Sequence, residues 1–315
     1  MCKPISEPVQ VLSSYDERPL VDDLLDKHAK AIASVRENIL ADDESKAIYE
    51  KGDNTKRYDD IWILRYVLSH KGHVKSASKA AMKTIKFREE SKLNEAGDLR
   101  HRIKQHGVKD SEMMASIEPL PGYQLYNKYC EENAICTTLP DENRGIVVYY
   151  DMGKMDQHGL AEGMDAEQMK EMVLYSNEAM FQVVDEITRT TGRLTKVMKI
   201  VDMSSTGFRK MNRAFLQRDG ASSKASEDYY PQLLACIMVM NGPTWLSTFW
   251  SLLRPVIPKR VAEKVDFLPS VAKMKGNKTT LKSILKYVSE ENLPEKYAGL
   301  NKQWPLPCVS ERYVM

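Results

Sequence analysis

The sequence predicts an α/β fold in which a helical N-terminal unit precedes a β-sheet covered by helices. Two observations support this class. Through the first ninety residues, apolar side chains recur at the spacing of α-helices. At Gly145 the pattern changes, and short β-rich segments then alternate with helical ones, as in sheets that carry helices on their faces. A chain of 315 residues is long enough to bury a sizeable core.

The N-terminal part is predicted to contain three helices. Their apolar stripes cover Leu20–Leu40, a segment from Ile61 to about Gly72, and Val74–Arg88. A polar stretch around Gly52 interrupts the pattern between the first two helices. We therefore assign residues 1–19 to a flexible tail and residues 20–95 to a helical unit.

The remainder is predicted to form one sheet-containing domain over residues 96–300, followed by a tail over 301–315. Its strands are expected at Ile146–Tyr150, Val197–Met203, Leu233–Met240 and Val265–Leu268. Asp165 and Gln168 form the capping-box pattern that opens a long helix, and Gly192 ends it. A last helix is expected at Thr279–Ser289.

The apolar residues between positions 91 and 140 show no clear helical or strand periodicity. Pro119, Pro121 and Gly122 interrupt this segment. We expect a helical turn or two joined to loops.

Charge and cysteine content narrow the class of partner. The 46 Lys and Arg residues nearly balance the 44 Asp and Glu residues, so we expect no nucleic-acid partner for the molecule as a whole. Five scattered cysteines fit neither a zinc module nor a disulfide framework and indicate a reducing compartment. The N-terminus lacks a secretory pattern, and no segment is long and apolar enough to span a bilayer. We expect a cytoplasmic monomer that visits membranes peripherally.

The motifs of common α/β enzymes are absent from the sequence. It has no dinucleotide-binding glycine motif, no phosphate-binding loop and no serine nucleophile elbow. Cys136 and Arg144 are too far apart for a cysteine-phosphatase loop. His70 and His73 fit a solvated helix end better than a metal site, and Asp202 fits a cap of the turn that follows it. We expect no catalytic residues, no metal and no cofactor.

The densest apolar segment of the chain lies between residues 244 and 257. Its apolar side chains fall on two helical faces, as in a helix that is fully buried or one that borders an apolar ligand or a membrane. From Arg254 to Lys286 basic residues dominate, with Glu263 and Asp266 as the only acids. Each base near an anionic bilayer contributes about 1 kcal/mol to binding. We therefore expect transient contact with an anionic membrane surface.

Several short motifs occur in order along the chain. They are Ile63–Leu68 with Lys71 and Val74, Phe87-Arg88, Gly145–Tyr150, Ile200–Met203, Tyr229–Gln232, Met240–Pro243, Leu253–Pro255 and Asn292–Tyr297. At these spacings they resemble the motifs of the CRAL-TRIO family of lipid-binding proteins, and more closely its yeast-type phosphatidylinositol transfer branch. Phe87 stands where the family usually has Trp.

The resemblance implies a helical unit followed by a mixed β-sheet that floors an apolar lipid pocket closed by a helical gate. The gate would comprise the segment after Pro243 and the helix that follows it, with Trp245, Phe249, Trp250, Leu253, Val256, Ile257 and Val261. A buried acyl chain gains about 0.8 kcal/mol per CH₂. Lipid would therefore be exchanged at a bilayer, without chemistry.

In the transfer branch, two lysines and a glutamate bind the inositol phosphate headgroup. Lys71 and Lys264 match the two lysines, and each suits a phosphate as a compact charge. Gln232 replaces the glutamate, which keeps an acceptor but removes the charge. The resemblance also places Tyr149 and Ser226 in the lipid pocket.

Val197 and Lys199 occupy strand positions that carry small hydroxyl residues serving phosphatidylcholine in that branch. If Asp202 ends the strand, alternation points Lys199 into the pocket, where an ammonium needs an anionic partner or becomes neutral. A slip of one residue would point it to solvent. Phosphatidylcholine binding is therefore left open.

The resemblance implies intracellular binding and transfer of a phospholipid, with phosphatidylinositol as the leading ligand. Two alternatives remain: a carrier of another hydrophobe, tocopherol-like or retinoid-like, and a membrane-recruiting interaction module without transfer activity. A soluble α/β enzyme is a more distant alternative.

Overall fold

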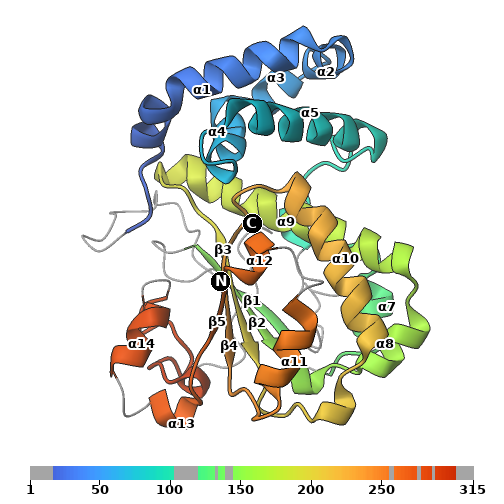
Figure 1. The fold of residues 1–315 in the computed structure, drawn as a ribbon, viewed down its shortest axis with the longest axis vertical. Coiled ribbons are helices and arrows are strands. Elements are labelled where there is room, and N and C mark those ends of the chain that lie inside the picture. The colour runs from blue at the N-terminus through green and yellow to red at the C-terminus, as the bar shows by residue number, and fades with distance from the viewer. Residues whose placement is uncertain are drawn as a thin grey trace, which may run out of the picture.

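The computed structural model describes residues 17–102, 120–131, 134–138, 145–254, 259–274, 278–285 and 288–302. A helical N-terminal unit lies across one end of a domain built around a β-sheet (Figure 1). No helix among these residues is both long and apolar enough to cross a bilayer.

The helical unit contains five helices rather than three. They are α1 (Val21–Ala41), α2 (Asp43–Tyr49), α3 (Asn54–Arg57), α4 (Asp60–Ser69) and α5 (Val74–Glu90). The prediction missed α2 and α3, which occupy the polar stretch. Helix α2 forms there because Asp42 caps it, accepting a hydrogen bond from Ser45 N, and because Asp43 and Glu44 complement the dipole of its first turn.

Within the described parts of the chain, the sheet has five strands in the order β1-β2-β3-β4-β5. They are β1 (Ile135–Thr138), β2 (Ile146–Asp151), β3 (Val197–Asp202), β4 (Leu234–Met240) and β5 (Val265–Phe267). Strand β1 pairs antiparallel to β2, and the other neighbours are parallel. The expectation of only helical turns and loops over residues 91–140 is therefore wrong for β1, which has only four residues and too little pattern to reveal a strand.

Helices cover both faces of the sheet (Figure 1). On one face lie α9 (Ala166–Thr191) and α10 (Arg213–Tyr229), with α7 (Tyr123–Asn127), α8 (Gln157–Gly163), α11 (Leu246–Leu253) and α12 (Lys259–Ala262). On the other, α13 (Val271–Met274) and α14 (Lys278–Leu285) enclose a second core cluster. The predicted capping box of α9 is confirmed, because Gln168 N donates to Asp165 Oδ1 and Asp165 N donates to Gln168 Oε1.

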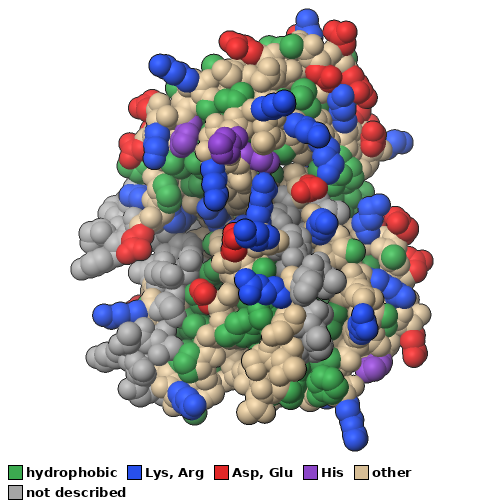
Figure 2. Space-filling model, viewed as in Figure 1, with side chains coloured by type: hydrophobic (Ala, Val, Ile, Leu, Met, Phe, Trp, Pro, Cys, Tyr) green, Lys and Arg blue, Asp and Glu red, His purple; other side chains and the backbone are tan. Residues whose placement is uncertain are grey.

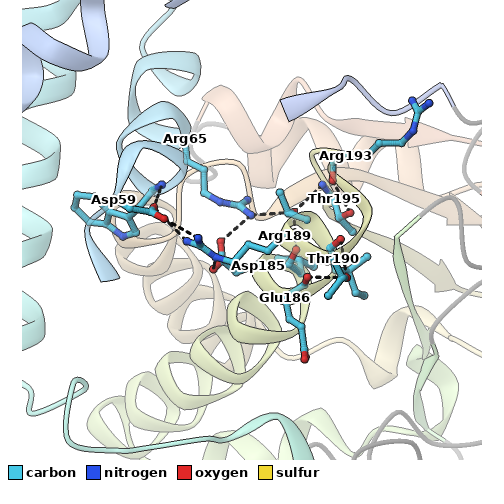
Figure 3. Close-up of polar contacts among 12 residues, drawn as sticks. Asp59, Arg65, Asp185, Glu186, Arg189, Thr190, Arg193 and Thr195 are labelled. Carbon is cyan, nitrogen blue, oxygen red and sulfur yellow. Dashed lines mark hydrogen bonds and ion pairs between the residues drawn. The ribbon is translucent and has the colours of Figure 1, made fainter. Parts of the chain in front are cut away.

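A polar network joins the helical unit to α9 (Figure 3). Arg65 on α4 is fully buried, and its Nη2 lies 3.3 Å from Asp185 Oδ1 and 3.2 Å from Thr188 Oγ1. Arg189 Nη1 lies 2.6 Å from Asp59 Oδ2 at the start of α4. Because these contacts join residues more than one hundred positions apart, they fix how the helical unit sits on the sheet domain.

A second buried pair joins α5 to α9. Arg88 and Glu178 are 6% and 2% exposed, and their side chains form two hydrogen bonds of 2.7 and 2.9 Å. Tyr230 Oη donates to the same carboxylate at 2.8 Å, and Gln182 Nε2 donates to it at 3.1 Å. Burial alone would raise the pKa of Glu178, but the Arg88 charge and these hydrogen bonds hold it below the ordinary value.

Candidate functional site

A cavity of about 1410 Å³ lies between the sheet, α9, α10 and the helical unit. It exceeds the roughly 300–1,000 Å³ that is usual for small-molecule sites. Its floor comes from alternate residues of the parallel strands and is apolar except at Lys199; the apolar residues are Val148, Val197, Val201, Ile237 and Val239. The cavity can therefore hold a large, mostly apolar ligand.

Strand alternation decides which residues of β2 face this cavity. Val148 and Tyr150 line it. Tyr149 points to the opposite face, where its ring stacks on Tyr297 with centroids 5.1 Å apart, inside the second core cluster. The placement of Tyr149 in the pocket is therefore wrong by one strand position.

On β3 the predicted orientation agrees with the structure. Val197 and Lys199 both line the cavity, and Asp202 ends the strand. The alternative register, with Lys199 in solvent, does not occur. Contact between these residues and a lipid stays a prediction.

The three predicted headgroup residues come together on the cavity lining, although they lie far apart in the sequence. Lys71 lies in the turn between α4 and α5, and Gln232 follows Tyr230 and Pro231; both have left-handed backbones, with φ of 52° and 62°. Gln232 Nε2 donates to Ser69 Oγ at 3.0 Å, which ties the two loops together. Lys264 Nζ donates to Leu234 O at 2.8 Å.

Positive charge surrounds this part of the cavity. In Figure 2, Lys and Arg side chains gather between the helical unit and the sheet domain. The described lining contains more cations than carboxylates: Lys71, Lys79, Lys83, Lys199, Lys224, Lys259, Arg260 and Lys264 against Asp219, Asp228 and Glu263. Burial, with the charges of Lys264 and Arg65, also lowers the pKa of the nearby Lys196 to about 8. An anionic group would be stabilised here.

The predicted gate borders the cavity through α11 and α12. Trp250 and Val261 line it, and the Trp250 ring meets Phe267 edge-on, with centroids 5.2 Å apart. Trp245 precedes α11 and contacts Phe208 instead, at 5.5 Å between ring centroids.

Several predicted residues cannot be placed in this way. The side chains of Phe249, Leu253 and Ser226 lie outside the described parts of the chain, as do Val256 and Ile257 altogether.

Sequence reasoning missed several charged residues of the cavity wall, namely Lys79, Lys83, Lys224, Asp219 and Asp228. Asp219 on α10 lines the cavity and interacts electrostatically with Lys199. Nothing in the polar sequence of α10 distinguishes it from the neighbouring exposed residues.

The structure places the other polar candidates in structural roles. Asp202 Oδ1 accepts hydrogen bonds from Ser204 N and Asn241 Nδ2, both at 2.9 Å, so the prediction of a turn cap is confirmed. The other carboxylate oxygen, Asp202 Oδ2, lies 3.4 Å from Lys296 Nζ, a partner that the sequence did not reveal. Among the described residues, no group of three His, Cys, Asp or Glu side chains could hold a metal ion.

A large apolar cavity, floored by a mixed sheet and bordered by short helices, defines a lipid-binding class of protein. The family model of the CRAL/TRIO domain matches residues 131–299, more than half of the chain, so the chain belongs to the CRAL/TRIO family. Members of this family bind and transfer lipids. The predicted family and fold class are thereby confirmed, and the predicted domain boundaries stay predictions.

The chain is similar to proteins from fungi and plants. Over 269 residues it is 23% identical to the Sec14 cytosolic factor of Schizosaccharomyces pombe, a match that covers 84% of this chain and 83% of that protein. It is 20% identical over 258 residues to Patellin-3 of Arabidopsis thaliana, covering 79% of this chain but 44% of the relative. The crystal structure of Sfh5 is similar with a TM-score of 0.46 and 14% identity, covering 82% of this chain and 83% of that one.

Proposed function

We propose that the protein holds one phospholipid in the cavity, with phosphatidylinositol as the leading ligand, and moves it between membranes. The observation that carries this proposal is the joint geometry of the cavity. Its apolar floor can take acyl chains, while Lys71, Lys264 and Gln232 meet on the same lining, where an anionic headgroup would be stabilised. The match to a protein named Sec14 cytosolic factor supports a cytoplasmic location.

The free energy of burying the acyl chains explains why lipid would be exchanged at a membrane. Each buried CH₂ is worth about 0.8 kcal/mol, so a lipid leaves the cavity only for another apolar medium. We infer that the gate opens when α11, α12 and their exposed cations Lys259 and Arg260 meet an anionic bilayer surface. No bond is made or broken in this cycle.

The headgroup assignment rests on the charges of two lysines and on the position of the Gln232 amide. Lys71 and Lys264 each offer a compact ammonium to a phosphate. The Gln232 amide can bond inositol hydroxyls, and its contact with Ser69 fixes its position. Without the glutamate of the family pattern, the protein should show its own preference among inositol lipids.

Transfer of fluorescent phosphatidylinositol from donor to acceptor vesicles tests the proposal. We expect the protein to accelerate transfer in proportion to its concentration, because one lipid is carried per cycle. Bound lipid without acceleration would support the interaction module instead, and acceleration of a tocopherol-like or retinoid-like probe alone would support the other carrier.

Trp250 provides a test of the gate. Trp250→Ala removes part of the cavity wall and its contact with Phe267, so lipid should dissociate roughly tenfold faster, since burying a large apolar side chain is worth about 1.5–3 kcal/mol. Stopped-flow release of a pyrene-labelled lipid into excess vesicles measures this rate.

Leu300→Ala is the matched control, because Leu300 is 59% exposed and does not line the cavity. Equal rates of lipid release from the two variants would contradict a gating role for Trp250.

A further inference from the structure

The two ends of the cavity differ in their exposure to solvent. Beside the gate, Trp250 is half-buried and Lys259 is exposed, although both line the cavity. At the opposite end, beside α7 and the first turns of α9, the lining residues Leu120, Tyr126 and Met172 are only 2%, 5% and 7% exposed. Among the described lining residues, the cavity is therefore open beside the gate and closed by a wall beside α7.

This wall is held by contacts between α7, α9 and the segment that follows β2. Gly122, which begins α7, has a left-handed backbone with φ of 77°. A Cβ atom at Gly122 would lie 2.7 Å from Met172 Cβ, so the two helices touch directly. Tyr126 Oη also donates a hydrogen bond to Met155 Sδ at 3.9 Å. The wall can move outward only by breaking these contacts.

The sheet sets the distance from the headgroup residues to the walled end. Leu234, which binds Lys264, opens β4, and Ile135 lines the cavity on β1 at the edge of the sheet. The two residues are separated by three strand spacings, from β4 to β1, and by the four steps from Ile146 to Tyr150. At about 4.8 Å per spacing and 3.3 Å per step, taken at right angles, the distance is roughly 19 Å. An acyl chain in one leaflet spans about 15 Å, half of the hydrocarbon core, so an ordinary membrane chain fills this space up to the wall.

Chain length should change binding only when the chain is longer than the space. A CH₂ group that enters the cavity leaves a bilayer of similar apolarity, so chains that fit are exchanged without preference for length. A CH₂ group that the wall excludes loses the burial that it had in the bilayer. Each such group lowers binding about fourfold, which corresponds to about 0.8 kcal/mol. Forcing the chain into the packed wall is unfavourable as well, because overpacking displaces side chains.

We infer that Leu120, Tyr126 and Met172 set the greatest acyl-chain length that the protein accepts, so that lipids with longer chains stay in the membrane. Length selection belongs to the α7 end, because the exposed gate end offers no comparable wall in the described lining. The inference deepens the proposed function and rests on it, since it requires a phospholipid in the cavity.

Competition among phosphatidylinositols that differ only in chain length tests the inference. Vesicles contain equal amounts of the dipalmitoleoyl, dioleoyl and dierucoyl lipids, in order of increasing chain length, and native mass spectrometry identifies the species bound to the full chain. We expect the first two lipids to be bound equally. The dierucoyl lipid should be bound at least about tenfold less, because several of its CH₂ groups lie beyond the limit.

Substitutions in the wall should relax this limit. Met172→Ala shortens a wall side chain and should raise the bound share of the dierucoyl lipid at least about fourfold, as for one further CH₂ group admitted. Met169→Ala is the matched control, because Met169 is equally part of the buried face of α9 but does not line the cavity. Tyr126→Leu opens the wall at a second position, and Tyr175→Leu is its control, since Tyr175 is half-buried and does not line the cavity.

Equal binding of all three lipids by the unaltered protein would refute the length limit while leaving the proposed function intact. The assignment to this wall would be wrong if the share of the dierucoyl lipid rose no more in Met172→Ala and Tyr126→Leu than in their controls. Binding of none of the three phosphatidylinositols would contradict the proposed function, and this inference with it.

Discussion

Replacing Lys71 and Lys264 together by alanine is expected to lower phosphatidylinositol transfer on the order of 100-fold. Hydrogen bonds to charged groups contribute about 1.5–3 kcal/mol each, and two ammonium groups would be lost from one phosphate. The substitutions leave the apolar residues of the cavity floor unchanged, so the protein should still fold. Initial rates of transfer between vesicles, measured at several protein concentrations, give the effect.

A matched control separates the headgroup from general surface charge. Lys75→Ala with Lys170→Ala removes two exposed lysines that do not line the cavity, and it should leave transfer within about twofold of the unaltered protein. If the Lys71 and Lys264 variant transfers phosphatidylinositol as fast as this control, the headgroup assignment is wrong.

Glu178→Ala is expected to lower the free energy of unfolding by about 3–5 kcal/mol, which is the typical cost of breaking a buried pair by removing one partner. The substitution leaves the Arg88 guanidinium buried without its two carboxylate bonds and removes the acceptor of Tyr230. Urea unfolding followed by circular dichroism measures the change. Glu167→Ala, on the exposed side of α9, is the control and should change stability by less than about 0.5 kcal/mol.

The same pair makes stability depend on pH. The folded protein holds the pKa of Glu178 below its ordinary value of 4.5. The ionised Glu178 therefore contributes fully to the free energy of unfolding above pH 4.5, and this contribution is lost as the pH falls through the folded pKa. Glu178→Gln should therefore show a flatter loss of stability below pH 4.5 than the unaltered protein. Parallel curves would show that the pair does not titrate as described.

The strand residues show what alternation can and cannot predict. Asp202 marks the end of β3, and counting back from it placed Lys199 toward the cavity correctly. On β2, every residue from Ile146 to Tyr150 is apolar, so the sequence has no alternating signal that distinguishes Tyr149 from its neighbours. An error of one strand position therefore assigned Tyr149 to the cavity face, whereas its side chain lies in the core cluster on the opposite face of the sheet.

The long-range polar contacts could not be predicted from the sequence, for a different reason. Arg88 and Glu178 are 90 residues apart, and the pattern around Glu178 is that of an ordinary amphipathic helix. Asp219 similarly looks like one of many polar residues of α10. Periodicity predicts which face of an element is buried, but only the packing of distant elements decides which buried charges meet.

The central claim is that the cavity carries one lipid, and native mass spectrometry of the intact protein tests it most directly. We predict a mass above that of the polypeptide by one phospholipid per chain, with phosphatidylinositol as the main species after solvent extraction. A protein that shows only the polypeptide mass, both as purified and after incubation with phosphatidylinositol vesicles, would contradict the account.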